Sequence, residues 1–173
     1  MKFLISFLLA LLTSCSSSKK VKPVTNFDLE RYYGTWYEIT KLDYSFEREC
    51  SKARFIYLPP SHHSGMDITN ECLDAEENII KDAFAKAHVK KNNVAEFAVY
   101  LYSIIQLEYR VVYIDENYEY AIIDGGNFDY YWIISKLKNP DMIKIESLIS
   151  KAKMLGFDTT NIIVNKFKDF KPI

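Results

Sequence analysis

Short runs of β-branched and aromatic residues, separated by turn-forming residues, recur through most of the chain. Turn signals such as Pro59-Pro60 and Gly125-Gly126-Asn127 mark where the runs end. Because no helical period interrupts them, the pattern predicts eight strands that follow one another as a meander. The expected strands are Thr35–Leu42, Ser51–Leu58, Met66–Cys72, Asp82–Val89, Val94–Tyr102, Glu108–Ile114, Tyr118–Asp124 and Tyr130–Leu137.

An antiparallel sheet of this length must protect its two edge strands, and closure into a barrel removes both edges. A barrel of eight strands is just wide enough to hold one small ligand. The strand pattern therefore predicts a closed barrel with room for a ligand.

The hydrophobic period becomes helical only near the C-terminus. Asn139-Pro140-Asp141 predicts the start of a helix, and Gly156 predicts its end. Between these signals the apolar residues recur at helical spacing: Met142, Ile145, Leu148, Ile149, Ala152 and Leu155. We expect this stripe to pack against the barrel wall, and Asn161–Val164 to form a short final strand.

The N-terminal pattern predicts a secretory signal. Lys2 precedes the ten-residue, largely apolar run Phe3–Leu12, which is too short to span a membrane, since a span needs roughly 20 residues. The run leads into Leu12-Thr13-Ser14-Cys15, which resembles the lipobox of bacterial lipoproteins. That resemblance implies a signal peptide over residues 1–14, a lipid on Cys15, a tether over residues 15–25 and one domain over residues 26–173. The alternative is a plain signal peptide with an incidental cysteine.

Composition narrows the class of partner. Cleavage before Cys15 would leave 159 of the 173 residues and, with the loss of one lysine, change the formal net charge from −1 to −2. So small a charge gives no indication of a nucleic-acid partner. Aromatic residues make up 15% of the chain, with 13 Tyr and 11 Phe, and such rings can fill a core or surround a cavity.

Two cysteines remain after cleavage, Cys50 and Cys72. In an exported protein a disulfide is favoured over two free buried thiols. The two residues lie at the outer ends of the second and third expected strands, which a hairpin would bring back together. With no C-x-x-C motif, and with His62-His63 in an expected turn, we expect neither a metal site nor a cofactor.

Four blocks of sequence carry a family resemblance. Gly34-Thr35-Trp36, within Asn26–Ile39, matches the G-x-W signature of the lipocalins near the start of their barrel. Phe46-Glu47-Arg48, Tyr131–Lys136 and Leu155–Asp158 resemble elements of the bacterial outer-membrane lipoprotein lipocalins, the apolipoprotein D-like subgroup. The resemblance extends from Asn26 to about Val164.

The resemblance implies an all-β fold, an eight-stranded up-and-down antiparallel lipocalin barrel with a C-terminal α-helix packed outside. A short helical turn would lead into the first strand. Gly34, Trp36 and Lys136 would form the signature at the closed base of the barrel. The family has an arginine where this chain has Lys136, but a lysine over Trp36 can still make a cation–π contact. The family's second signature, T-D-Y, has no clear copy here.

Side chains alternate between the two faces of a strand. If the same strand positions face inward as in the lipocalins, this alternation predicts which residues form the inner wall. Such a wall is apolar with several phenolic hydroxyls, which suits an elongated hydrophobic ligand with a polar head. Alternatively, the same side chains simply fill the barrel. The expected ligand-binding residues are Phe55, Tyr57, Ile68, Phe97, Val99, Tyr109, Tyr113, Tyr120 and Trp132.

Glu38 shares a strand face with Trp36 and is therefore expected to point inward. Because a buried carboxylate needs a partner, we expect Glu38 to belong to a structural hydrogen-bonded pair at the barrel base rather than to contact a ligand.

No nucleophile elbow, P-loop, dinucleotide or zinc-protease motif occurs, so we expect no enzyme. The resemblance implies binding or transport of a fatty acid or lysophospholipid during envelope maintenance. The protein would be anchored in the outer membrane of a Gram-negative bacterium by the lipid on Cys15, facing the periplasm, as a possible homodimer. Tetrapyrroles, carotenoids and sterols are further plausible ligands. A structural lipoprotein with a filled barrel and a lipid-modifying enzyme are the alternatives.

Overall fold

The computed structural model describes residues 20–102, 104–126, 128 and 130–165, without the side chain of Phe46. The expected signal peptide and Cys15 lie outside these described residues.

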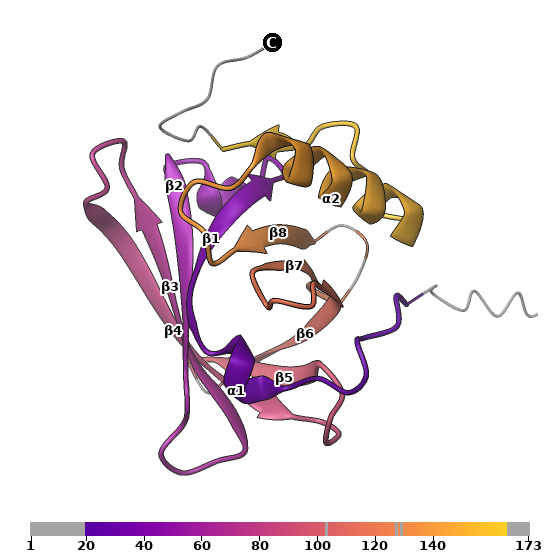
Figure 1. Cartoon of the computed structure of the whole chain (residues 1–173). Coiled ribbons are helices and arrows are strands. Elements are labelled where there is room, and N and C mark those ends of the chain that lie inside the picture. The colour runs from indigo at the N-terminus through magenta and orange to yellow at the C-terminus, as the bar shows by residue number, and fades with distance from the viewer. Residues whose placement is uncertain (1–19, 103, 127, 129, 166–173) are drawn as a thin grey trace, which may run out of the picture.

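Eight strands form a closed antiparallel barrel, in which each strand pairs with the next and β8 and β2 both pair with β1 (Figure 1). The predicted up-and-down barrel is therefore confirmed, with strands close to those expected. The strands are β1 (Gly34–Lys41), β2 (Lys52–Leu58), β3 (Gly65–Leu73), β4 (Ile79–Val89), β5 (Glu96–Leu101), β6 (Ile105–Ile114), β7 (Tyr120–Asp124) and β8 (Tyr131–Ser135).

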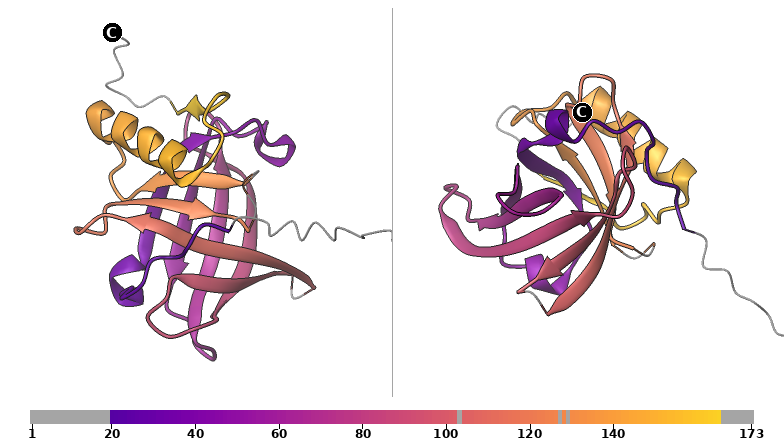
Figure 2. Two further views of the ribbon diagram at one scale, coloured as in Figure 1. Left: turned by 90° about the vertical axis from the view of Figure 1, so that its right-hand side faces the viewer. Right: turned by 90° about the horizontal axis from the view of Figure 1, so that it is seen from below.

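Two short helical segments mark the two ends of the barrel. α1 (Leu29–Tyr32) precedes β1, and its first turn is capped by the side chain of Asp28, which accepts from the backbone N–H groups of Glu30 and Arg31. The 3₁₀ segment η1 (Ser45–Glu47) lies in the connection from β1 to β2. In the left view of Figure 2 these two segments lie at opposite ends of the barrel. We call the α1 end the base and the other end the mouth.

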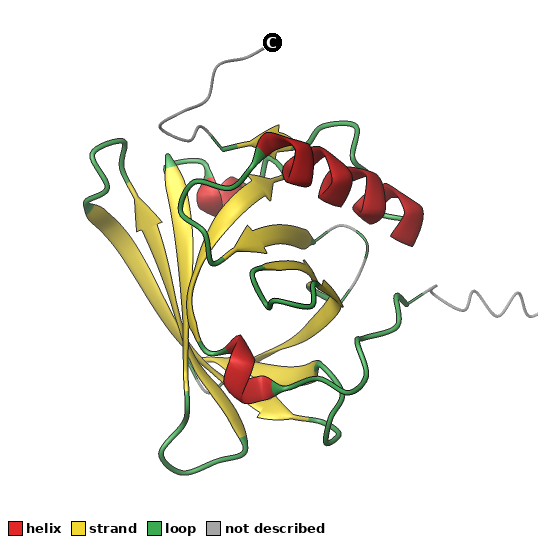
Figure 3. Cartoon of the chain, in the orientation of Figure 1, coloured by secondary structure: helices red, strands yellow, loops and turns green. Residues whose placement is uncertain are grey.

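α2 (Met142–Leu155) packs outside the barrel, as predicted (Figure 3). Asp141 caps its start by accepting from the backbone N–H of Ile143, and Gly156 ends it with a φ of 101°. The buried stripe Ile145, Leu148 and Ala152 packs on the outer faces of β7 and β8. The final strand, β9 (Ile163–Val164), pairs with the end of β1. Within the described ranges, no helix is long and apolar enough to cross a membrane.

The barrel wall separates two hydrophobic clusters. One fills the interior and includes Trp36, Tyr57 and Phe97. The other lies between the wall and α2, and includes Ile122 and Ile133. Both faces of β7 and β8 are consequently covered.

The predicted inward facing of Tyr113 and Tyr120 was wrong, because both lie in the cluster beneath α2. On β6 the register shifts between Val111 and Tyr113, which indicates a β-bulge, and Tyr113 turns outward. On β7 all five residues are buried, so polarity does not reveal which face is internal. Ala121 and Ile123 face the interior instead.

Candidate functional site

The base of the barrel is closed around Trp36, which is fully buried. Its indole N–H donates to the Tyr32 carbonyl at 2.8 Å. Lys136 Nζ lies 5.2 Å from the centroid of the Trp36 ring and donates to the carbonyls of Arg31 and Tyr33 at 2.7 and 2.9 Å. Gly34 has a φ of 120°, which other residues rarely adopt. The structure thus brings Gly34, Trp36 and Lys136 together, with the expected cation–π contact.

Three tyrosine hydroxyls meet above this base. The Tyr32 and Tyr109 hydroxyl oxygens are 2.6 Å apart, and Tyr109 donates to the Tyr57 hydroxyl at 2.8 Å. Burial raises the pKa of each of these phenols, most strongly for Tyr32 and Tyr109. With Phe27 and Phe97 packed against them, these neutral hydroxyls form a filled floor.

The inner face of the barrel wall is exposed above that floor. Leu107 pairs with Val99, and Ile105 pairs with Leu101. Because directly opposed residues share a sheet face and Val99 belongs to the interior cluster, all four side chains face inward. Yet Leu107 and Ile105 are 48% and 47% exposed, against 7% for Val99. The inner wall near the mouth is therefore apolar and accessible.

Strand β4, next to β5, contributes only small side chains to this part of the inner face. Ala85 pairs with Leu101 and with Ile68, which places it on the inner face, and Ala83 lies two residues further toward the mouth. Their small side chains take up little of the interior. We call the part of the interior that faces Ala83, Ala85, Leu101, Ile105 and Leu107 the upper lumen.

Seven of the nine expected ligand-binding residues belong to the interior cluster or pack against it, and Tyr113 and Tyr120 do not. Whether any of the nine contacts a ligand stays a prediction. The seven are Phe55, Tyr57, Ile68, Phe97, Val99, Tyr109 and Trp132.

Ile105 and Leu107 also belong to the inner wall, although the strand expected from the sequence began only at Glu108. The signal was present, since Ile105, Leu107, Tyr109 and Val111 alternate with a period of two.

The connection from β1 to β2 is fixed across one side of the mouth. The disulfide between Cys50 and Cys72, which confirms the favoured pairing, joins its end to β3. Tyr44 donates its hydroxyl to the Tyr131 carbonyl at 3.1 Å and accepts from the Tyr131 N–H at 2.9 Å. The Tyr44 ring also packs against Trp132, with centroids 5.5 Å apart. We call residues 42–51 the mouth loop.

A pair of buried carboxyl groups joins the mouth loop to β1. Glu38 is 2% exposed and accepts from Asn165 Nδ2 at 3.1 Å, while Glu47 accepts from Trp132 Nε1 at 3.4 Å. The other two oxygens, Glu38 Oε1 and Glu47 Oε2, find no donor among the remaining described groups. The two side chains hydrogen-bond to each other, so a proton held between them satisfies both oxygens.

Electrostatics keeps that proton in place. Burial, reinforced by the charge of Glu47, raises the pKa of Glu38 to about 8. Burial also raises the pKa of Glu47, opposed by its hydrogen bond from Trp132. The expectation of a structural hydrogen bond for Glu38 is therefore confirmed, with Asn165 and Glu47 as its partners. Its expected place at the barrel base was wrong, because Glu47 belongs to the mouth loop.

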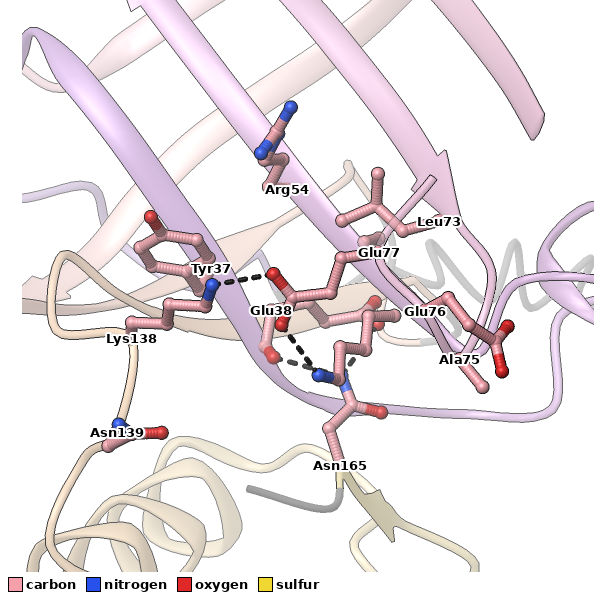
Figure 4. A pocket seen from close by; sticks show the side chains of 12 residues that line it. Tyr37, Glu38, Arg54, Leu73, Ala75, Glu76, Glu77, Lys138, Asn139 and Asn165 are labelled. Carbon is pink, nitrogen blue, oxygen red and sulfur yellow. Dashed lines mark hydrogen bonds and ion pairs between the residues drawn. The ribbon is translucent and has the colours of Figure 1, made fainter. Parts of the chain in front are cut away.

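A cavity of about 560 Å³ opens beside Glu38, where the ladder between β1 and β2 ends (Figure 4). Its wall is charged: Glu77 pairs with Lys52 at 3.0 Å and with Lys138 at 2.5 Å. This polar cleft differs in chemistry from the upper lumen. Among the residues that the structure describes, no group of three or more potential ligands could hold a metal ion.

A family model for a lipocalin-like domain matches residues 27–166. The chain is 33% identical over 156 residues to the outer membrane lipoprotein Blc of Vibrio cholerae, covering 88% of this chain and 91% of that protein. The outer membrane lipoprotein Blc of Escherichia coli is 29% identical over 160 residues, covering 91% and 89%. Among solved structures, insecticyanin from the tobacco hornworm Manduca sexta matches with a TM-score of 0.64 and 18% identity, over 87% of this chain and 86% of that one.

Proposed function

Because the chain belongs to the lipocalin family, we propose that its upper lumen binds a fatty acid or lysophospholipid in the bacterial envelope. One observation carries the proposal: Ile105 and Leu107 face inward yet remain nearly half exposed above a filled floor. A barrel filled by its own side chains, as in a purely structural lipoprotein, would bury both residues.

The proposed mechanism is reversible burial. The acyl chain enters the upper lumen, where each methylene removed from water contributes about 0.8 kcal/mol. The polar head stays near the mouth, since the floor below offers only neutral phenols that already bond to one another. Binding needs no covalent step.

We also propose that a lipid on Cys15 anchors the protein in the outer membrane, on its periplasmic side. The lipobox-like Leu12-Thr13-Ser14-Cys15 supports this, as does the similarity to two proteins named outer membrane lipoproteins. Replacing Cys15 with serine should release the protein from membrane fractions, whereas an unchanged membrane content would contradict the anchor.

Titration of the delipidated mature protein with lysophospholipid or a long-chain fatty acid tests ligand binding directly. We expect heat in calorimetry and a change in tryptophan fluorescence, because Trp132 packs against the interior cluster. Ala85→Phe should weaken binding by filling the upper lumen. Lys86→Phe, on the next residue of β4 and on the outer face, is the matched control. No heat and no fluorescence change for either lipid would contradict the proposal.

A further inference from the structure

The mouth carries an unusual concentration of exposed apolar side chains where β4, β5 and β6 meet. Ile104 is 83% exposed, Tyr102 65% and Phe84 60%. Ile105 and Leu107 continue the same edge on the inner face, at 47% and 48%. Together these five make up what we call the apolar tip.

The residues of the tip lie at neighbouring strand ends. Ala85 and Leu101 are the last paired residues of β4 and β5, so Phe84 and Tyr102 are the next residues of the two strands. The backbone N–H of Ile104 donates to the Leu101 carbonyl at 3.2 Å, which holds the turn tightly against the strand end. Solvent-exposed apolar groups that gather in this way mark an interaction site.

We propose that the apolar tip inserts into the surface of a lipid bilayer, so that the mouth of the barrel faces the membrane. This inference rests on the proposed function for the ligand and for the lipid on Cys15.

The position of the N-terminal segment argues for a bilayer as the occupant. Lys20 Nζ lies 3.3 Å from Glu108 Oε1. Glu108 follows Ile104 of the tip by four residues, which corresponds to about 13 Å along a strand. Cys15 precedes Lys20 by five residues, a length of chain that reaches up to about 17 Å. A lipid on Cys15 and the apolar tip can therefore enter the same membrane surface.

The route into the lumen argues for the same occupant. From Ile104 at the outside, the apolar surface passes through Ile105 and Leu107 to Val99 within the barrel. An acyl chain leaving a bilayer at the tip would reach the upper lumen along apolar side chains. Docking at the tip would thus shorten the path of the ligand through water.

Partitioning onto vesicles of phosphatidylethanolamine and phosphatidylglycerol tests the inference. The mature chain carries Cys15→Ser, so that only the folded domain can bind. We expect Ile104→Glu combined with Tyr102→Ser to weaken partitioning at least about tenfold, because two apolar side chains lose their burial in lipid. Ile143→Glu, at a residue of α2 whose exposure (77%) lies between those of Tyr102 and Ile104, is the matched control and should change partitioning less than twofold.

Equal partitioning of the tip variant and the control variant would overturn the inference, as would no binding by the Cys15→Ser chain at millimolar lipid. A dimer that the tip variant dissociates would also overturn it, since a second copy would then cover the tip. Calorimetric titration of the tip variant with monomeric lysophospholipid distinguishes a failure of membrane docking from a failure of the proposed ligand binding. We expect unchanged affinity there, together with slower transfer of the lipid from vesicles to the protein.

Discussion

The side-chain amide of Asn165 donates to both the backbone carbonyl and the carboxyl group of Glu38, at 2.9 and 3.1 Å. The two residues are 127 positions apart, and the contact connects the segment after β9 to β1. On its other side the Glu38 carboxyl bonds to Glu47 of the mouth loop. Glu38 therefore joins three segments of the chain through a carboxyl group that is neutral at physiological pH.

That arrangement makes stability depend on pH. In the folded protein the pKa of Glu38 is about 8, against 4.5 ordinarily. Between these values the unfolded chain binds fewer protons than the folded one, so the free energy of unfolding falls as pH rises from 4.5 to 8. Glu38→Gln cannot ionise, yet its amide can still accept from Asn165 and donate to Glu47. We expect this variant to exceed the parent protein in stability at pH 8, by up to about 4 kcal/mol, but not at pH 5.

Urea unfolding at pH 5 and pH 8 measures both free energies. Glu146→Gln, on the exposed face of α2, is the control and should leave the pH dependence unchanged. An identical pH dependence for Glu38→Gln and the parent would mean that Glu38 does not hold the proton.

The disulfide should contribute strongly to stability. It joins residues 22 positions apart, and closing a loop of this length stabilises the fold by roughly 3 kcal/mol in the chain-entropy account. Reductant should therefore lower the melting temperature of the parent protein. The double variant Cys50→Ala with Cys72→Ala should melt near the reduced parent and show no response to reductant. A parent protein that melts at the same temperature with and without reductant would contradict this contribution.

The charged amino group of Lys136 should stabilise the base through its cation–π contact and its hydrogen bonds, more than the side chain does by filling volume. Lys136→Met keeps most of the side-chain volume but removes the cation–π contact and two hydrogen bonds to carbonyl groups. We expect it to lower the free energy of unfolding by about 1–3 kcal/mol. Lys136→Arg restores the residue typical of the family and should lose less than about 1 kcal/mol. Denaturant unfolding compares the two, and equal losses would show that the charged contacts are unimportant.

The local stability of the mouth loop should depend on the Tyr44 hydroxyl. Tyr44→Phe leaves the buried Tyr131 N–H without its acceptor, which costs about 1–3 kcal/mol. Amide hydrogen exchange should therefore increase in residues 42–51. Tyr102→Phe alters a hydroxyl on a 65% exposed side chain and serves as the control. Unchanged exchange in Tyr44→Phe would show that other contacts hold the loop.

The sequence predicted the barrel well because its strands alternate and its turns carry strong local signals. The disulfide and the base signature were also predictable, since each depends on a short motif or on one hairpin. The facing of Tyr113 and Tyr120 was not, because a bulge shifts the alternation and α2 covers the outer face. No local pattern could predict the partners of Glu38, because Asn165 reaches it only after the chain has crossed the whole barrel.

Native mass spectrometry of the protein released gently from its membrane tests the central claim most directly. We predict one bound lipid per chain, with the mass of a fatty acid or lysophospholipid. Ala85→Phe should lose this lipid, and Lys86→Phe should retain it. A parent protein without any bound lipid that also takes none up from a lipid extract would contradict the account.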